Sequence, residues 1–136
     1  MNPTSRPTAR AAATAIAVSV LLGAAAAPAY AKTSVTVTAM PISVDAGSAL
    51  VVVTGRGADD AAGYQRVCVA EAARTGPWQV VACSPVGYDY ARAVSADVPL
   101  DSVAPQHFRA ELFHVSSPSG ANPVLLAASS TATVSA

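Results

Sequence analysis

The two cysteines, Cys68 and Cys83, are the residues whose types and spacing point most directly to a chemistry. Thiol–disulfide oxidoreductases place their cysteines two residues apart, and that spacing is absent here. If Thr75 and Gly76 form the loop of a two-residue hairpin, Cys68 falls directly opposite Cys83, where the two sulfur atoms can bond. We therefore predict a structural disulfide, and closing its loop of roughly 15 residues contributes about 3 kcal/mol.

The same hairpin register assigns each side chain to a face of the sheet. Cys68 and Cys83 share one face with Arg66 and Gln79, so we expect the disulfide to join neighbouring strands on the outside of a sheet. It would differ from the disulfide between the two sheets of antibody domains. The opposite face is the predicted core side of the hairpin and carries Val67, Val69, Trp78, Val80 and Ala82.

The remaining polar residues do not form a pattern for metal binding or catalysis. His107 and His114 are seven residues apart, so on one strand they face opposite sides and cannot share a metal. The pair Asp59–Asp60 lacks the alternating acidic ligands and the glycine of a calcium loop and is typical of a solvated turn. No serine stands in a nucleophile elbow, and no glycine-rich loop opens a helix. We expect no catalytic residue, no metal, no cofactor and no enzymatic activity.

Aromatic residues offer the best candidate for a contact surface. Tyr88 and Tyr90 flank Asp89 in a segment that follows the second cysteine. Exposed tyrosines beside a carboxylate can stack on sugar rings or on apolar ligands. The alternative is that one tyrosine packs at the edge of the fold and keeps only its hydroxyl in solvent. Phe113 is also expected on an exposed sheet face, where a partner or a covering loop could contact it.

The elements that must position these residues are strands. Apolar and polar residues alternate with a period of two, and turn residues separate the alternating segments at regular spacing. We expect Pro41 to break the first strand and Gly55 and Gly57 to end the second. The pattern is typical of an all-β sandwich or barrel. The seven expected strands are Ser34–Thr38, Ala49–Thr54, Tyr64–Ala72, Trp78–Ser84, Ala91–Val98, His107–Val115 and a strand within Ala127–Val134.

Residues 1–31 have the organisation of a signal peptide. Arg6 and Arg10 precede the uncharged segment 11–27, and Ala29-Tyr30-Ala31 is a small-x-small cleavage site. No twin arginine precedes the apolar segment, which favours the general secretory route. We predict cleavage after Ala31, an extracellular domain over residues 32–136, and no integral membrane segment after processing. The alternative is an uncleaved anchor, for which the apolar segment is short.

The charge changes when the signal peptide is excluded. The whole chain has eight basic and eight acidic residues, whereas residues 32–136 have six basic and eight acidic residues, a formal charge of −2. A weakly acidic domain lacks the basic field that holds a phosphate backbone or an anionic membrane. We therefore exclude nucleic acid as a partner.

Three segments resemble the small secreted immunoglobulin-like domains of actinobacteria. They are Gly-Tyr-Gln-Arg-Val-Cys-Val from Gly63, Thr-Gly-Pro-Trp-Gln-Val-Val-Ala from Thr75, and His-Phe-Arg-Ala-Glu-Leu from His107. The resemblance implies an immunoglobulin-like β-sandwich of about seven antiparallel strands in an extracellular setting. It implies a secreted, non-catalytic module that binds a partner or associates with the cell envelope. The partner would be an extracellular protein, a cell-wall polysaccharide or a small molecule.

A second resemblance is to the enediyne-antibiotic carrier proteins of the neocarzinostatin type. It rests on Ser34–Thr38, on Asp45-Ala46-Gly47 and on the valine-rich strand that ends at Gly55. Those carriers are small secreted immunoglobulin-like sandwiches that hold an aromatic chromophore in a cleft. This chain departs from them in having one disulfide rather than two and few glycine-rich cleft segments, and no cleft residue can be transferred. The resemblance implies, as an alternative function, a carrier of a small ligand.

Overall fold

The structure is a computed structural model that describes residues 32–45, 47–72, 76–89 and 91–136. The predicted signal peptide, Thr75 of the predicted turn and Tyr90 lie outside the described residues. The described part of the chain contains no helix and nine strands. These are β1 (Thr33–Asp45), β2 (Ser48–Asp59), β3 (Tyr64–Ala72), β4 (Gln79–Cys83), β5 (Gly87–Tyr88), β6 (Arg92–Pro99), β7 (Gln106–Val115), β8 (Val124–Ala128) and β9 (Ala132–Val134).

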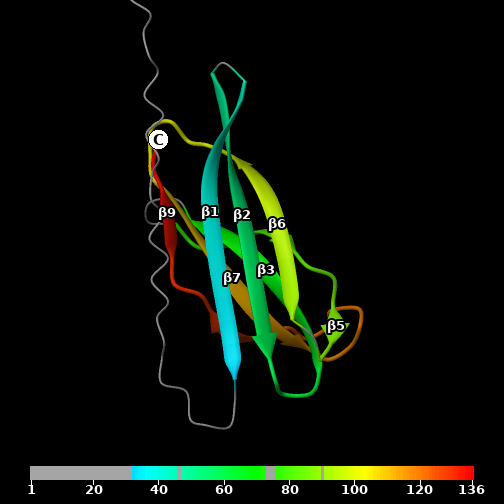
Figure 1. Cartoon of the computed structure of the whole chain (residues 1–136). Helices are drawn as coiled ribbons and strands as arrows, with labels where there is room; N and C mark the ends of the chain where they lie inside the picture. The colour runs from blue at the N-terminus through cyan, green and yellow to red at the C-terminus, as the bar shows by residue number, and fades with distance from the viewer. Residues whose placement is uncertain (1–31, 46, 73–75, 90) are drawn as a thin grey trace, which may run out of the picture.

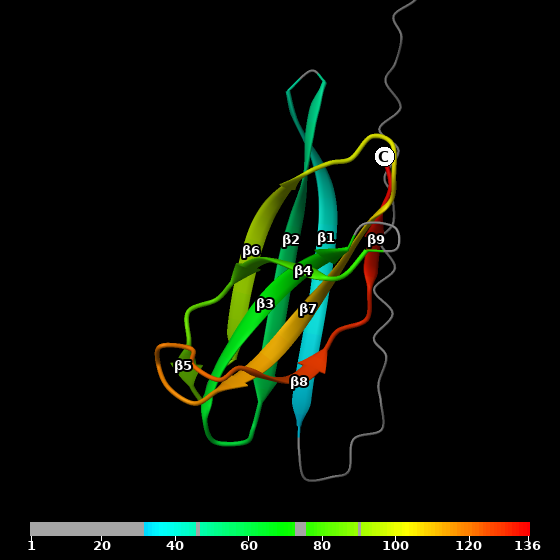
Figure 2. The same ribbon diagram turned by 180° about the vertical axis from the view of Figure 1, so that it is seen from behind.

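The strands form two antiparallel sheets that pack face to face. One sheet has three strands in the order β1-β2-β6, which are in front in Figure 1. The other has six strands in the order β4-β3-β7-β8, with β5 added to β3 and β9 added to β7, and it is in front in Figure 2. In immunoglobulin nomenclature the three-stranded sheet contains strands A, B and E, and the other sheet contains strands C′, C, F and G. The prediction of an antiparallel immunoglobulin-like sandwich is confirmed, with two short strands beyond the expected seven.

The core lies between the two sheets and is built from small and medium-sized apolar side chains. Among the described residues, Phe108 is the one aromatic residue in the core, and it is fully buried. Because every second residue of each strand faces inward, the core draws on residues of matching parity along the strands. The core residues are Val37, Ala39, Val51, Val53, Val67, Val69, Val98, Phe108, Ala110, Leu112, Ala132 and Val134.

Two of the predicted strand breaks are wrong. β1 continues through Pro41, which a sheet tolerates because β1 is an edge strand and pairs only with β2. β2 continues through Gly55 and Gly57 to Asp59. A Cβ atom at Gly57 would lie 2.6 Å from Cγ2 of Val67, so the missing side chain is what lets β3 approach β2.

Two serines end strands of the six-stranded sheet in the same way. Ser84 follows β4, and its hydroxyl oxygen accepts a hydrogen bond of 3.0 Å from the N–H of Val67. Ser129 follows β8, and its hydroxyl oxygen accepts a hydrogen bond of 2.8 Å from the N–H of Ala110. Each serine N–H also donates to the carbonyl of the same partner residue. The side chain therefore replaces a backbone acceptor for a buried amide, and the neighbouring strand can turn away.

The predicted hairpin register holds at the cysteines. Cys68 pairs with Cys83 and Val69 pairs with Ala82, as the two-residue loop requires. Beyond this pair the register shifts by one residue, and Val81 has no residue directly opposite. This is a β-bulge, which inserts one extra residue and reverses the faces of the β4 residues between Val81 and the turn.

The bulge makes three of the predicted face assignments wrong. Val80 is 56% exposed and pairs with Ala70 on the outer face of the sheet, although it was predicted in the core. Trp78 also lies on the outer side, where its ring stacks on Arg109. Gln79, predicted beside the cysteines, pairs instead with Glu71 of the opposite parity. The residues of β3, together with Ala82 and Cys83, keep the predicted faces.

Candidate functional site

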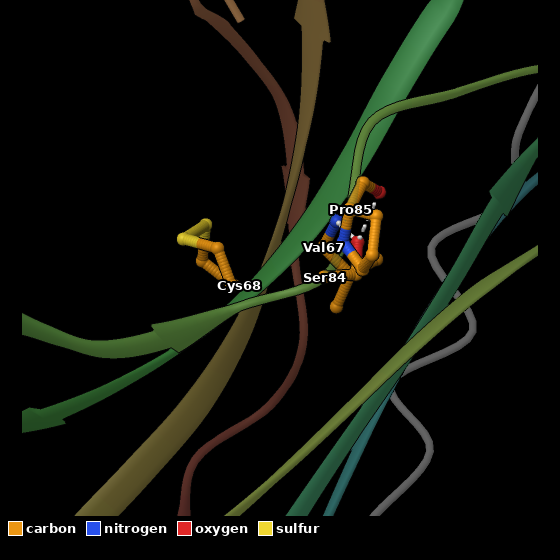
Figure 3. The surroundings of a disulfide bond; sticks show 5 residues. Val67, Cys68, Ser84 and Pro85 are labelled. Atoms are coloured by element: carbon orange, nitrogen blue, oxygen red, sulfur yellow. Dashed lines mark hydrogen bonds between the residues drawn. A yellow bond between two sulfur atoms is a disulfide. The ribbon is translucent and has the colours of Figure 1, made fainter.

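The disulfide between Cys68 and Cys83 is formed as predicted. The two Cα atoms are 4.0 Å apart on neighbouring strands of one sheet. Figure 3 shows its sulfur atoms on the side of β3 away from the other sheet, while Ser84 and Pro85 lie on the opposite side. The half-cystine at Cys68 is 1% exposed, whereas Cys83 is exposed. The bond therefore links β3 and β4 on the outer face of the six-stranded sheet.

Aromatic side chains are concentrated on the same outer face. The structure describes five aromatic residues, and all but the core residue Phe108 lie on this side of the six-stranded sheet. Strands β1, β2 and β6 of the other sheet contain no aromatic residue. We call the outer side of the six-stranded sheet the aromatic face. Its aromatic residues are Tyr64, Trp78, Tyr88 and Phe113.

Trp78 forms one end of the aromatic face together with two charged residues of β7. The guanidinium carbon of Arg109 lies 4.5 Å from the centroid of the Trp78 ring. Nε of Arg109 donates a hydrogen bond of 3.3 Å to Oε1 of Glu111, which forms an ion pair at the same distance. The stacking and the ion pair together hold the guanidinium plane against the ring.

A second arginine lies over a second aromatic ring. The guanidinium carbon of Arg66 is 5.8 Å from the centroid of Phe113, which is the residue opposite it on β7. Nε of Arg66 is buried and has no hydrogen-bond partner among the described residues. A Cβ atom at Gly120 would lie 2.9 Å from Nη1 of Arg66, so the guanidinium packs closely on this loop. The predicted outward position of Phe113 is confirmed, and the arginine covers part of its ring.

Tyr88 lies at the other end of the aromatic face and is 49% exposed. Its ring meets the ring of Tyr64 edge to face, with centroids 5.1 Å apart. Asp89 has a positive φ of 54°, and its Oδ1 accepts a hydrogen bond of 2.8 Å from the N–H of Gly63. The carboxylate of Asp89 therefore holds the β5 segment on β3, while Tyr88 presents its ring to solvent. Tyr90 of the predicted contact surface lies outside the described residues.

Small outward side chains of β3 are buried within the aromatic face. Cys68 and Ala70 are almost completely buried, and Ala72 is 7% exposed, although all three point outward. Ala70 pairs with Arg109 on one side and with Val80 on the other. Larger neighbours therefore cover the β3 residues, which form the floor of the face.

The histidines and the acidic pair have structural contacts. His107 and His114 alternate to opposite faces of β7, as predicted, and Nδ1 of His107 lies 2.9 Å from Oγ1 of Thr133. Oδ1 of Asp59 accepts a hydrogen bond from Thr33, and Oδ1 of Asp60 accepts one from the backbone N–H of residue 32. Among the residues that the structure describes, no three His, Cys, Asp or Glu side chains gather as metal ligands would.

Two hollows of the surface lie beside the aromatic face or on the other sheet. One has a volume of about 330 Å³ at the β3–β4 hairpin and is lined by residues that include Glu71, Pro77 and Val80. The other has a volume of about 230 Å³ and lies on the three-stranded sheet around Arg56. Neither is lined by the cysteines or by Tyr88.

Comparison of the chain with protein-family models, with curated proteins and with solved structures found no match. The class that the strand order defines is the immunoglobulin-like β-sandwich with one outer-face disulfide. Within its described residues the chain has no helix able to cross a membrane.

Proposed function

We propose that the protein is an exported, non-catalytic binding module that holds cell-envelope polysaccharide on its aromatic face. The observation that carries the proposal is the unequal distribution of aromatic side chains. Four lie on the outer side of one sheet, and strands of the other sheet carry none. Rings at the surface with polar neighbours are what a protein uses to stack on sugars. The sequence contains no nucleophile-elbow pattern, and among the described residues no three His, Cys, Asp or Glu side chains gather as metal ligands would.

Export is part of the proposal and rests on two features. The first is the sequence of residues 1–31, with Arg6 and Arg10 before an uncharged segment and a small-x-small site ending at Ala31. The second is the disulfide, because such bonds persist in oxidising spaces outside the cytosol. An extracellular domain of about 100 residues with a modest core gains stability from one such bond.

Retention on insoluble cell-wall material tests the proposed function. We expect the wall to retain the wild-type protein and Trp78→Ala or Tyr88→Ala to lower the association constant about fivefold each, because each change removes a stacking ring. Met40→Ala is the matched control, since Met40 is 63% exposed on the three-stranded sheet. Walls that retain no wild-type protein would contradict the proposal, as would an equal loss in the Met40 variant.

A carrier of a planar aromatic ligand is the second candidate function. The observation that favours it is the hollow of about 330 Å³ at the β3–β4 hairpin, which is lined by residues that include Glu71, Pro77 and Val80. Protein purified from the native culture supernatant would then carry visible or near-ultraviolet absorbance beyond that of its own tyrosines and tryptophan. A spectrum with only the absorbance of tyrosine and tryptophan would contradict the carrier function and favour the binding module.

A further inference from the structure

Two arginines on the aromatic face each lie over an aromatic ring. The guanidinium carbon of Arg66 lies over Phe113 at 5.8 Å from the ring centroid, and that of Arg109 lies over Trp78 at 4.5 Å. An aromatic ring under a guanidinium fixes the plane of its fork of donors, so little side-chain freedom is lost when an acceptor binds. Both guanidinium groups therefore lie on the outer side of the same sheet, with Nε of Arg66 buried and Nη1 of Arg66 close to Gly120.

The donors of the two arginines are only partly used within the described residues. Glu111 accepts a hydrogen bond from Nε of Arg109 and is only 7% exposed, so its carboxylate is buried and already paired. Arg66 forms no ion pair with a described carboxylate, and its buried Nε has no partner. Among the described residues, this part of the surface thus carries the two guanidinium groups of Arg66 and Arg109 and the single carboxylate of Glu111. It is basic, although residues 32–136 have a net negative charge. Unpaired, preoriented guanidinium donors favour an anionic acceptor.

The sheet register gives the spacing of the two positive groups. Arg66 is opposite Phe113, and Arg109 lies four residues earlier on β7, opposite Ala70. Four residues of an extended strand span about 13 Å. The row that contains the disulfide and Glu111 lies between them. A ligand that reaches both arginines must therefore be an extended chain with repeated anionic groups rather than a single small anion.

We propose that the aromatic face binds a polyanionic glycopolymer, whose carboxylate or phosphate groups contact Arg66 and Arg109 while its sugar rings contact Trp78 and Tyr88. This inference rests on the proposed function and names the chemistry of the polysaccharide. A carboxylate and a phosphodiester present the same pair of acceptor oxygens to a guanidinium. Polyuronate and poly(glycerol phosphate) distinguish these two sources.

Calorimetric titration of the disulfide-bonded protein with polygalacturonate, poly(glycerol phosphate) and neutral dextran tests this inference. We expect one of the two polyanions to bind with an affinity that falls as salt rises, and dextran to bind at least about tenfold more weakly. Arg66→Gln and Arg109→Gln should each lower that affinity about tenfold. Arg56→Gln is the control, because Arg56 is exposed on the outer face of the other sheet. It should leave the affinity unchanged.

The variants also separate this inference from the proposed function. Arg66→Lys keeps the charge but loses the planar fork, so an intermediate affinity with an unchanged thermal midpoint supports recognition by geometry. Full wall retention by the folded double variant of Arg66 and Arg109 would overturn the anionic chemistry and leave the binding module intact. An equal loss in the Arg56 variant, or equal affinity for single-stranded DNA, would also overturn it, since either means unspecific charge attraction.

Discussion

The outer faces of the two sheets differ although both belong to strands with the same alternating pattern. On the three-stranded sheet, Thr54 of β2 and Ser95 of β6 lie side by side, with their hydroxyl oxygens 3.1 Å apart. On the six-stranded sheet, the corresponding outward positions carry the disulfide, two arginines and four aromatic rings. Alternation requires only that the inward side of a strand is apolar. The residues on the outward side can therefore differ between the two sheets and can form a binding surface. Under the proposed function, the three-stranded sheet serves as the scaffold and the six-stranded sheet as the recognition surface.

The three-stranded sheet also has an exposed apolar patch, but its side chains are aliphatic rather than aromatic. At the β1–β2 hairpin, which extends beyond the sandwich in Figures 1 and 2, Met40, Ile42 and Val44 are exposed on the outer side of the three-stranded sheet. These aliphatic side chains have neither aromatic rings nor basic neighbours in register, because Met40 pairs with Val52 and Ile42 pairs with Leu50. Met40 is therefore an informative control for every test of the aromatic face.

Removing the disulfide should give the largest loss of stability. We expect the double variant Cys68→Ala/Cys83→Ala to unfold with a free energy lower by about 3 kcal/mol, since the loop between the cysteines becomes unconstrained in the unfolded chain. Urea denaturation followed by tryptophan fluorescence measures this loss. A double variant with the wild-type urea midpoint would show that the disulfide does not stabilise the folded domain.

Filling the space between the sheets should have the next largest effect. Gly57→Ala should lower the free energy of unfolding by about 2 kcal/mol, because the new Cβ atom would lie 2.6 Å from Cγ2 of Val67 and 3.3 Å from Cδ1 of Leu112. Adding Val67→Ala should recover part of the loss in a double-mutant cycle. Purely additive losses would contradict the account of close sheet packing at this glycine.

A comparison of two hydroxyl groups should give the smallest effects. Ser84→Ala leaves the buried N–H of Val67 without its acceptor, and we expect a loss of about 1.5 kcal/mol. Thr54→Ala removes an exposed hydroxyl contact on the other sheet, and we expect a loss of about 0.5 kcal/mol. Thermal denaturation of both variants measures the difference. Equal losses would mean that Ser84 has no special part in ending β4.

The sequence predicts the strands where neighbouring residues alone decide them. Tyr64–Ala72 was predicted with the observed bounds, and the pairing of Cys68 with Cys83 follows from the turn residues. Pro41 and Gly57 were misinterpreted as strand breaks because their effect depends on partners far along the chain. A proline is tolerated where no further strand pairs, and a glycine is required where a second sheet comes close.

The candidate site was predicted less completely than the fold. Tyr88 and the outward Phe113 were predicted as surface aromatics, but Trp78 was predicted in the core. The error comes from the bulge at Val81, because one extra residue moves the side chains between the bulge and the turn to the other face. The stacking of Arg109 on Trp78 joins two segments 31 positions apart, and only the folded register brings them together.

The most direct test of the central claim is a map of amide chemical shifts on the isotopically labelled protein as soluble cell-wall fragments are added. The account predicts that shifts concentrate on β3, β4 and β7, around Trp78, Arg109 and Phe113. Amides of β1, β2 and β6 should remain unchanged. Shifts centred on Met40 to Val44 of the three-stranded sheet, with none around Trp78, would contradict it.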